Sequence, residues 1–448
     1  MAILDQVSPL LALINQAART LETEYKKGQG HVPSLDDTSQ HPLDERISSP
    51  EMKEAVQVLE GACTQLCATL ARPNHTITNA LEPSCLHVAL AFRIPDILQK
   101  KPSGMHVTEI SQQCGVEPSK LARILRLLSA QHCFREVERD TFANNRLSVQ
   151  ILAANPLHSF GLHMTEDAMH AGIKLAEILA DDDWGHSFVP EHSAWNRYTK
   201  QSKPMFDFWE ETPEMRAYGD RFGVAMLGWG AAVEADSVIT GYPWKDLKSD
   251  ASVCDLGGGV GLMTMHLARA YPNLQLKLQD LPDRMMQARD KIWPAQCPDA
   301  LEENRIEFKA IDFFTESPIE GCDVYYMKNI LHAWPHTECV TILKGVRKSM
   351  KPGSRVLIHE YILQTAGSND QTDVDKRFKQ APAPLLSNYG AGRIRQYNLD
   401  LSLMALVNSQ ERTLDEYVQL GEEAGLKFAK LWEFGDMSVV ELCASDDD

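Results

Sequence analysis

The first apolar pattern lies near the start of the chain, where hydrophobic residues recur every three or four positions. These positions are Leu10, Leu11, Leu13, Ile14, Ala17 and Leu21, and a similar pattern returns over residues 52–70. The spacing places the apolar side chains on one helical face and predicts two amphipathic helices. Residues 28–49 between them are rich in Gly, Pro, Ser, Asp and His, which predicts a flexible connection. An apolar stripe on a terminal helix needs a partner, so we expect a homodimer.

From residue 81 to about residue 152 the pattern changes to short helices followed by a polar hairpin. Residues 106–128 predict a helix, a turn at Gly115 and a second helix opened by Pro118, which is the outline of a winged helix-turn-helix. That outline alone suggests a DNA-binding regulator. The basic residues of the second helix are only Lys120, Arg123 and Arg126. Because binding a phosphate backbone needs several basic side chains, we favour a structural or dimerising role.

After residue 250 the pattern becomes strand, turn and helix, repeated several times. The strand candidates are residues 253–255, 275–280, 306–311, 323–327 and 356–360, and two closing strands follow at 428–434 and 437–442. Short apolar strands alternating with helices predict an α/β fold with a doubly wound parallel sheet. Helices are predicted over residues 262–270 and from Pro335 to about residue 350. Thr413 and Glu416 form a capping box that opens another helix.

Composition and charge narrow the class of protein. The chain has 448 residues, of which 44% are hydrophobic and 24% charged, as in globular proteins of two or three domains. Lys and Arg number 44 against 62 Asp and Glu, so the formal net charge is −18, which disfavours nucleic acid as a partner. No apolar run is long enough for a membrane span, and no secretory pattern opens the sequence, so we expect a cytoplasmic protein without membrane attachment. Cys63 and Cys67 lack further ligands nearby, and no metal is expected.

The first candidate for chemistry is a glycine-rich loop at the end of the first predicted strand of the sheet. It follows Asp255 and carries Gly257, Gly259 and Gly261 in a Gly-x-Gly-x-Gly spacing. Glycines let a ligand approach the backbone beyond the carboxyl ends of the strands. The dinucleotide pattern has a different spacing, and a carboxylate here would repel a pyrophosphate but can pair with an ammonium group. The loop therefore favours S-adenosylmethionine over NAD.

Two further positions complete a candidate nucleoside site. Asp280 and Leu281 end the second strand, where an acid accepts hydrogen bonds from ribose hydroxyls. Asp312 and Phe313 follow the third strand, where an acid can accept from an adenine amino group beside a ring that stacks on the base. Each is weak evidence alone, but parallel strands bring all three sites to one edge of the sheet.

His332 lies just after the fourth strand, on the same edge as the glycine loop. An imidazole titrates near neutral pH, so a histidine there suits proton transfer. Glu360 ends the neighbouring fifth strand, and we expect its carboxylate to orient the imidazole of His332. His336 could suggest a metal pair, but no third ligand is evident.

These motifs together resemble the plant-type, caffeic-acid-like O-methyltransferases, in particular their fungal secondary-metabolism branch. The matching segments are residues 255–261, 278–282, 311–313, 328–334, 358–363 and 411–413. The resemblance implies an S-adenosylmethionine pocket that includes Lys328, a catalytic base at His332 and flanking carboxylates at Glu360 and Glu411. It implies a small aromatic or polyketide-like acceptor lined by Met226, Met404 and Asn408, with Phe206, Phe208, Trp209 and Trp229 as aromatic neighbours.

The resemblance also implies the domain organisation. We expect a helical extension with a flexible linker over residues 1–75 and a winged-helix dimerisation domain over residues 76–155. A Rossmann-like methyltransferase domain with a doubly wound sheet is expected over residues 156–448. Residues 365–396 exceed the plant pattern and predict a flexible insertion near the acceptor entrance.

One departure keeps an alternative function open. The family usually has Asp directly after the catalytic His, whereas this chain has Ala333. Some fungal relatives hold S-adenosylmethionine without consuming it and catalyse pericyclic rearrangements, and the loss of that acid leaves this reading available. His332 favours methyl transfer to a hydroxyl, because a phenol with a pKa near 10 needs a base at neutral pH.

Overall fold

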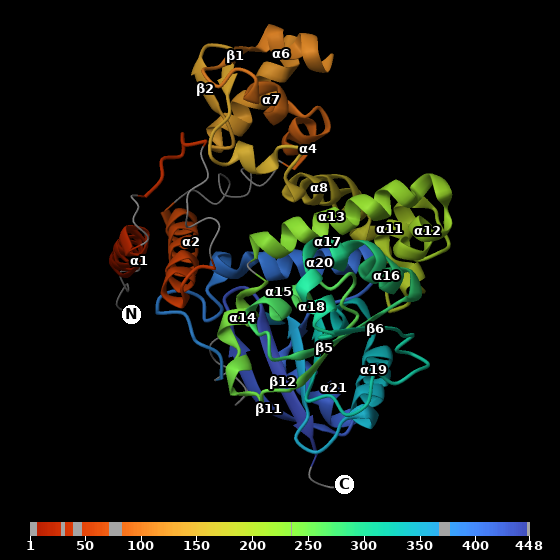
Figure 1. Ribbon diagram of the computed structural model, residues 1–448. Helices are drawn as coiled ribbons and strands as arrows, with labels where there is room; N and C mark the ends of the chain where they lie inside the picture. Colours follow the sequence, from red (N-terminus) through yellow and green to blue (C-terminus); the bar gives the residue numbers. More distant parts are fainter. Residues whose placement is uncertain are drawn as a thin grey trace. The chain divides into compact units, whose positions relative to one another are not determined.

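The computed structural model describes residues 7–27, 32–38, 47–70, 83–233, 235–366 and 377–445. The chain forms two compact units (Figure 1). Unit 1 comprises Met1–Glu234 with Met404–Asn408, and unit 2 comprises Ala235–Leu403 with Ser409–Asp448. The predicted domain boundaries at 75/76 and 155/156 stay predictions, since the two units divide elsewhere and residue 75 lies outside the described part.

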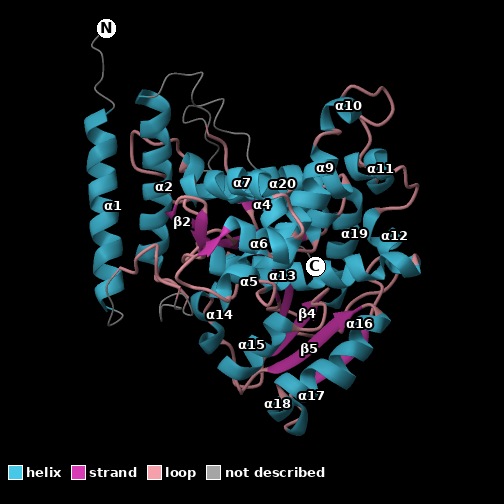
Figure 2. Ribbon diagram, turned by 90° about the horizontal axis from the view of Figure 1, so that it is seen from above, coloured by secondary structure: helices cyan, strands magenta, loops and turns pink. Residues whose placement is uncertain are grey.

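Unit 1 begins with the two predicted amphipathic helices, α1 (Val7–Lys27) and α2 (Pro50–Leu70), which lie side by side (Figures 1 and 2). Leu10 of α1 and Ala62 of α2 are fully buried, as their apolar stripes predict. The Ser49 hydroxyl donates to Glu24 over 3.0 Å and joins the start of α2 to α1. Most of the predicted flexible connection, residues 28–31 and 39–46, lies outside the described residues.

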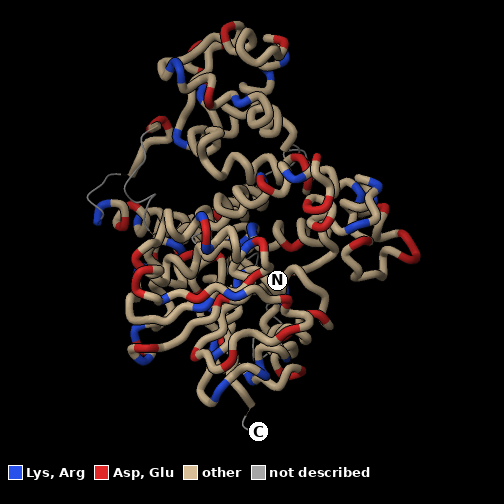
Figure 3. The backbone as a smooth tube through the Cα atoms, turned by 45° about the vertical axis from the view of Figure 1, so that its right-hand side comes forward, with Lys and Arg blue, Asp and Glu red and all other residues tan. Residues whose placement is uncertain are grey.

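The winged-helix outline is confirmed. Helices α4 (Pro83–Ala91), α5 (Ile94–Gln99), α6 (Val107–Cys114) and α7 (Pro118–Ala130) pack beside a small sheet in which β3 (Thr141–Ala143) lies between β1 (Met105–His106) and β2 (Arg135–Glu138). Gly115 takes a φ of 76° to end α6, and this left-handed turn is what glycine permits. Arg126 of α7 is paired with Glu136 and Asp140, and acidic and basic residues are interspersed along both units (Figure 3). Arg126 is therefore engaged in ion pairs, and the absence of a DNA-binding role stays a prediction.

The remainder of unit 1 is helical. It contains α8 (Pro156–His163), a π-helical turn η2 (Met164–Ala168), α9 (Met169–Gly172), α10 (Leu175–Leu179), α11 (Ala194–Thr199), α12 (Met205–Glu211) and α13 (Arg216–Ala232). Short 3-10 turns occur at Ser148–Ile151, Pro190–His192 and Pro213–Met215. Helices α8 and α13 pack closely, because a Cβ on Gly228 would lie 2.6 Å from the backbone of Pro156 and Leu157.

Unit 2 is built on a seven-stranded sheet with the order β11-β12-β8-β7-β4-β5-β6. The strands are β4 (Ser252–Leu256), β5 (Gln275–Asp280), β6 (Ile306–Ala310), β7 (Val324–Lys328), β8 (Arg355–Glu360), β11 (Leu426–Glu433) and β12 (Ser438–Ala444). Neighbours from β6 to β8 run parallel, and β12 pairs antiparallel with both β8 and β11. Each predicted strand is present, with ends that differ by at most two residues. The predicted α/β doubly wound sheet is therefore confirmed.

Helices cover both faces of this sheet. One face packs against α14 (Ser237–Gly241), α15 (Leu262–Ala270), α16 (Pro282–Gln287), α17 (Trp293–Gln296) and α18 (Pro298–Glu302), and some of these helices appear beside β4 and β5 in Figure 2. The other face packs against α19 (His336–Ser349) and α21 (Leu414–Glu423). The predicted capping box at Thr413 and Glu416 opens α21. The remaining described elements include helix α20 (Ile394–Val407) and a π-helical turn, η6 (Ala288–Ile292). There are also 3-10 turns at Trp244–Asp246, Leu331–Ala333 and Gly390–Arg393. Strand β9 (Ile362–Leu363) pairs with β10 (Arg412–Thr413) over two residues.

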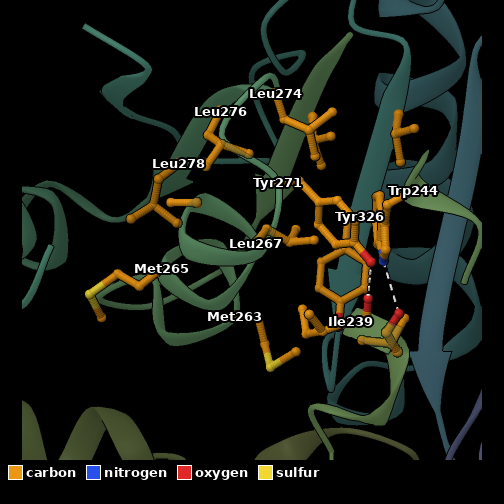
Figure 4. Packing of buried hydrophobic residues seen from close by; sticks show 14 of the residues in the cluster. Ile239, Trp244, Met263, Met265, Leu267, Tyr271, Leu274, Leu276, Leu278 and Tyr326 are labelled. Carbon is orange, nitrogen blue, oxygen red and sulfur yellow. Dashed lines mark hydrogen bonds between the residues drawn. The ribbon is translucent and has the colours of Figure 1, made fainter. Parts of the chain in front are cut away.

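Large aromatic side chains form part of the hydrophobic core between the sheet and helices α14 to α18 (Figure 4). Trp244 is 1% exposed, and its indole nitrogen donates to the Val238 carbonyl over 2.8 Å. The Tyr271 hydroxyl donates to the Ile239 carbonyl over 2.6 Å. These bonds satisfy the polar ends of large buried rings. The core therefore holds β4 and α15, and with them the glycine loop, in a fixed position.

The predicted insertion at residues 365–396 is only partly described, because residues 367–376 lie outside the described part. Its described residues include Phe378 and Tyr389, which are 4% and 1% exposed. Phe378 packs in the hydrophobic core on the α19 and α21 face of the sheet, and the predicted flexibility of the insertion stays a prediction.

Candidate active site

The glycine loop joins the carboxyl end of β4 to the start of α15. Gly257, Gly259 and Gly261 have φ angles of 72°, 59° and 87°, which favour glycine. A Cβ on Gly261 would lie 2.7 Å from Leu278 and 2.9 Å from the indole nitrogen of Trp293, whereas one on Gly259 would meet nothing within 4 Å. Trp293 donates to the Val260 carbonyl over 3.0 Å. The loop is therefore packed on its inner side and open at Gly259.

Asp255 lies behind this loop. Its carboxylate is 2% exposed and accepts a hydrogen bond from the Thr264 hydroxyl at the start of α15. Burial raises the pKa of Asp255 to about 6, although Thr264 and the charge of Lys328 oppose the shift. Asp255 thus ties β4 to α15, and the predicted pairing of its carboxylate with an ammonium group stays a prediction.

Asp280 links the end of β5 to the glycine loop. Its Oδ2 accepts from the Gly259 amide over 2.8 Å, and its Oδ1 accepts from the Leu281 amide over 2.7 Å. Leu281 is 51% exposed. The two predicted cofactor sites are therefore in direct contact.

Phe313 brings the third predicted cofactor site to the same edge. Its ring carbon lies 3.8 Å from where a Cβ on Gly257 would stand, and its ring meets Trp334 edge-on at 6.2 Å. The exposed Asp312 accepts from the Phe314 amide and the Thr315 hydroxyl, so it shapes this turn. The structure therefore brings Phe313 to the glycine loop, as the strand order predicts.

His332 lies on a 3-10 turn, Leu331–Ala333, between β7 and α19. Its Nδ1 is 2.7 Å from Glu411 Oε1, and the two residues are 8% and 3% exposed. Burial alone would lower the pKa of His332, but the charge and hydrogen bond of Glu411, with the charge of Glu360, outweigh burial and raise it. The positive charge of Lys328 opposes this rise. The pair is the arrangement in which a carboxylate holds one imidazole nitrogen and leaves the other to accept a proton.

Glu360, whose carboxylate we expected to orient the imidazole of His332, makes no hydrogen bond to that ring. Its Oε1 accepts from the amides of Ile330 and Leu331 over 3.0 and 2.7 Å, and its Oε2 accepts from the Tyr417 hydroxyl. The reason is that Glu360 is buried beside the amino end of the turn, whereas Glu411 reaches Nδ1 from the segment after α20. Glu360 therefore acts on His332 through the backbone and through its charge.

Lys328 ends β7 and is half-buried. Burial lowers the pKa of its ammonium group, and the nearby charges of Asp255 and Glu360 oppose that shift. Lys328 thus lies in the field of both the carboxylate behind the glycine loop and the carboxylate that braces the turn of His332.

The predicted acceptor residues belong to unit 1. Phe206 and Trp209 of α12 meet edge-on at 5.8 Å, Trp195 lies 5.8 Å from Phe208, and Trp229 stacks on Phe160 at 4.7 Å. Met226 and Met404 are half-buried. The amide nitrogen of Asn408 donates to the carbonyls of Ser187 and Val189 over 2.8 and 2.9 Å, so both of its N–H groups hold a loop of this unit.

Comparisons with known proteins identify the family. A model of the O-methyltransferase domain matches residues 220–380, and a model of the O-methyltransferase dimerisation domain matches residues 74–154. The protein 3-O-methyltransferase 2 of Phanerochaete chrysosporium is 37% identical over 441 residues, which cover 97% of each chain. The chain belongs to the O-methyltransferase family.

Solved structures of other methyltransferases share the fold of this O-methyltransferase. The mitomycin 7-O-methyltransferase MmcR is 25% identical and superposes with a TM-score of 0.64 over 83% of this chain and 96% of its own. Human N-acetylserotonin methyltransferase, solved in complex with S-adenosylmethionine, is 19% identical with a TM-score of 0.61 over 81% of this chain and 95% of its own. The predicted resemblance is thus confirmed.

Several buried residues around His332 of this O-methyltransferase were not assigned a role from the sequence. They are Ser409, whose hydroxyl donates to the His332 carbonyl, Arg412, whose guanidinium donates to the carbonyls of Leu331 and Trp334, and Tyr417. Arg412 and Tyr417 follow Glu411 closely in sequence, but only their burial reveals that they face the turn. Among the described residues no group of three or more His, Cys, Asp or Glu side chains is placed to share a metal. Within the same residues, no helix has the length and apolar character needed to cross a bilayer.

Proposed function

We propose that this O-methyltransferase transfers a methyl group from S-adenosylmethionine to a phenolic hydroxyl of a small molecule, with His332 as the general base. The observation that carries the proposal is the buried His332–Glu411 pair, with 2.7 Å between Nδ1 and Oε1, on the sheet edge that bears the glycine loop. A carboxylate on Nδ1 favours the tautomer whose Nε2 carries the free electron pair. No described residue forms a hydrogen bond to that Nε2.

The cofactor is S-adenosylmethionine, and the loop between β4 and α15 fits it. The loop is open at Gly259 and has positive φ angles at three glycines, which is the cradle that a bound nucleoside needs. Asp280 lies where it can accept from ribose hydroxyls, and Asp312 and Phe313 lie where an adenine can bind. When bound, the cofactor supplies an electrophilic methyl group on a sulfonium. Asp255 and Lys328 set the charge behind the site.

The residues of this chain then supply orientation and proton removal. The acceptor hydroxyl gives its proton to Nε2 of His332 while its oxygen bonds to the methyl carbon, and the electron pair of the breaking carbon–sulfur bond stays on sulfur. Glu411 stabilises the imidazolium that forms, through the hydrogen bond on Nδ1. General-base help of this kind contributes about 10²- to 10⁴-fold, and alignment of the three reacting atoms contributes the rest.

The proposed acceptor class follows from the base. A buried base is needed for a hydroxyl that is protonated at neutral pH but acidic enough to lose its proton, and a phenol has both properties. Phe206 is 38% exposed and offers a ring face on which an aromatic acceptor can stack, whereas Trp209 is 2% exposed and packs edge-on against Phe206, and Trp229 stacks on Phe160. We propose that these residues, with Phe208, Met226, Met404 and Asn408, recognise a secondary-metabolite-like phenol. The dimerisation domain supports a homodimer.

A panel of acceptors tests this function. The enzyme is incubated with S-adenosylmethionine carrying a labelled methyl group and with matched pairs of phenols and cyclohexanols. We expect label and S-adenosylhomocysteine to form in equal amounts with phenols and not with the alcohols, whose pKa is too high for an imidazole base. Cofactor binding without S-adenosylhomocysteine from any acceptor would contradict the proposal and favour the pericyclic alternative.

A further inference from the structure

The carbonyl groups of the turn that carries His332 accept hydrogen bonds from buried side chains, namely the guanidinium of Arg412, the thiol of Cys339 and the hydroxyl of Ser409. Arg412 is 1% exposed, and its two terminal nitrogens donate to the Leu331 carbonyl over 2.7 Å and to the Trp334 carbonyl over 2.6 Å. The two carbonyls flank His332 on either side. A guanidinium presents its donors in a planar fork, so one side chain can fix both groups at once.

Burying a guanidinium is costly unless charges compensate it. Two carboxylates, Glu360 and Glu411, occupy the same region, and all three charges act on Tyr417. Burial raises the pKa of that phenol, the two carboxylates raise it further, and Arg412 opposes them. The guanidinium supplies two hydrogen bonds to the turn that an apolar side chain of similar volume could not make.

The contacts form a closed loop of interactions. Arg412 binds the turn, the turn carries His332, His332 binds Glu411, and Glu411 precedes Arg412 in the chain. The segment itself is anchored, because the Glu411 amide donates to Asp400 over 2.8 Å and Arg412 pairs with Ile362 between β10 and β9. The distance between the imidazole and its carboxylate is therefore set by the same backbone that holds the turn.

We propose that Arg412 is a positioning residue that keeps Nδ1 of His332 on Glu411. The kinetic part of this inference rests on the proposed function of His332 as a base. The structural part does not, because the hydrogen-bonded pair exists whether or not the enzyme transfers a methyl group.

The test replaces Arg412 by Lys and follows His332 directly. The ammonium group of Lys keeps the positive charge but cannot donate to the Leu331 and Trp334 carbonyls in the planar geometry of a guanidinium. The turn should therefore be held less firmly, while the positive charge of the site is kept. Arg305→Lys is the matched control, since Arg305 is also buried in unit 2 and donates to the Ala268 carbonyl over 3.1 Å, but precedes β6 at the opposite end of the strands. The full-length proteins are labelled with ¹³C-histidine, and the His332 signal is assigned by its loss in His332→Gln.

We expect the pKa of His332 to be lower in Arg412→Lys than in the wild type, because a looser contact with Glu411 supports the imidazolium less. In Arg305→Lys it should be unchanged. With an acceptor that the wild type methylates, kcat should be about 10- to 100-fold lower in Arg412→Lys, while KM for S-adenosylmethionine should stay within about twofold of the wild-type value. A folded Arg412→Lys protein with the wild-type His332 titration would overturn the inference. Absence of turnover in the wild type would contradict the proposed function and leave the titration result to decide on Arg412.

Discussion

At the scale of single residues, the site combines strong burial with compensating charges. His332, Glu360 and Glu411 are each less than 9% exposed, so their charges act on one another through little water. Burial disfavours the imidazolium and Glu411 favours it, and the second effect is the larger, which raises the pKa of His332. The imidazolium that the proposed mechanism requires of His332 is therefore supported by these charges.

This balance predicts the pH dependence of catalysis. The pKa of His332 is raised, so the acid limb of the kcat profile should lie above the ordinary imidazole pKa of about 6.5, and activity should fall as pH drops through it. Glu411→Gln removes the charge that raises this pKa while burial remains, so the limb should move to lower pH. Steady-state rates of the wild type and of Glu411→Gln, measured from pH 5 to pH 9, give the acid limb of each protein.

A second His–Glu pair in the same unit provides the control. His336 and Glu423 are 2.9 Å apart, but their side chains are 48% and 42% exposed. Glu423→Gln should leave the limb in place. If the acid limb lay at the same pH in the wild type and in Glu411→Gln, Glu411 would not be the residue that raises the pKa of His332.

The roles of the two carboxylates show what sequence reasoning reaches at this scale. Glu360 could be placed beside His332 because β7 and β8 are neighbours, and that placement is correct. The hydrogen bond belongs to Glu411, whose sequence position lies 79 residues from His332. Only the course of the chain after α20 decides which carboxylate reaches Nδ1, and no local pattern encodes that course.

At the scale of elements, the glycine loop depends on two kinds of constraint. Within the protein itself, Gly259 requires glycine for its positive φ and not for space, because a Cβ there would meet no protein atom within 4 Å. Gly261 requires glycine for two reasons: its φ is positive, and a Cβ would overlap Leu278 and Trp293, which are both fully buried. The two positions therefore separate backbone strain from steric overlap.

Alanine substitutions at these two glycines should differ. Gly259→Ala should lower the free energy of unfolding by about 1–2 kcal/mol, which is the cost of a left-handed alanine. Gly261→Ala should cost about 1–3 kcal/mol more, because overpacking adds to the strain. Denaturant unfolding of both variants measures the difference, and a Gly261→Ala protein as stable as Gly259→Ala would refute the steric argument.

Most elements of unit 2 could be predicted because their signals are local. A parallel strand buried on both faces reads as a short apolar run, and the capping box of α21 lies within four residues. The helices of unit 1 between α8 and α13 gave no comparable pattern, and the π-helical turn at Met164–Ala168 has none. Such turns form when packing requires an extra residue, which depends on partners distant in sequence.

At the scale of the whole molecule, the dimerisation domain and the two terminal helices point to a second copy of the chain. The family match over residues 74–154 supports this, and α1 and α2 carry apolar stripes beyond what their mutual contact covers, such as Leu11 at 44% exposure. The net charge of −18 opposes association, because like charges repel, so a dimer requires a specific apolar surface.

We therefore predict a homodimer in solution. Light scattering at micromolar concentration should give twice the mass of the chain, and deletion of residues 1–75 should dissociate the dimer or lower its solubility, because apolar surface loses its cover. A full-length protein that sediments as a monomer at that concentration would refute the prediction.

Methyl transfer depends, as we propose, on His332 as the base, and a comparison of single turnovers tests this role. Single-turnover transfer of a labelled methyl group is compared between the wild type and His332→Ala at saturating cofactor and phenol. We expect the rate in His332→Ala to be lower by about 10²- to 10⁴-fold, with cofactor affinity by calorimetry within about twofold of the wild type. A His332→Ala enzyme that transfers the methyl group at the wild-type rate would contradict it.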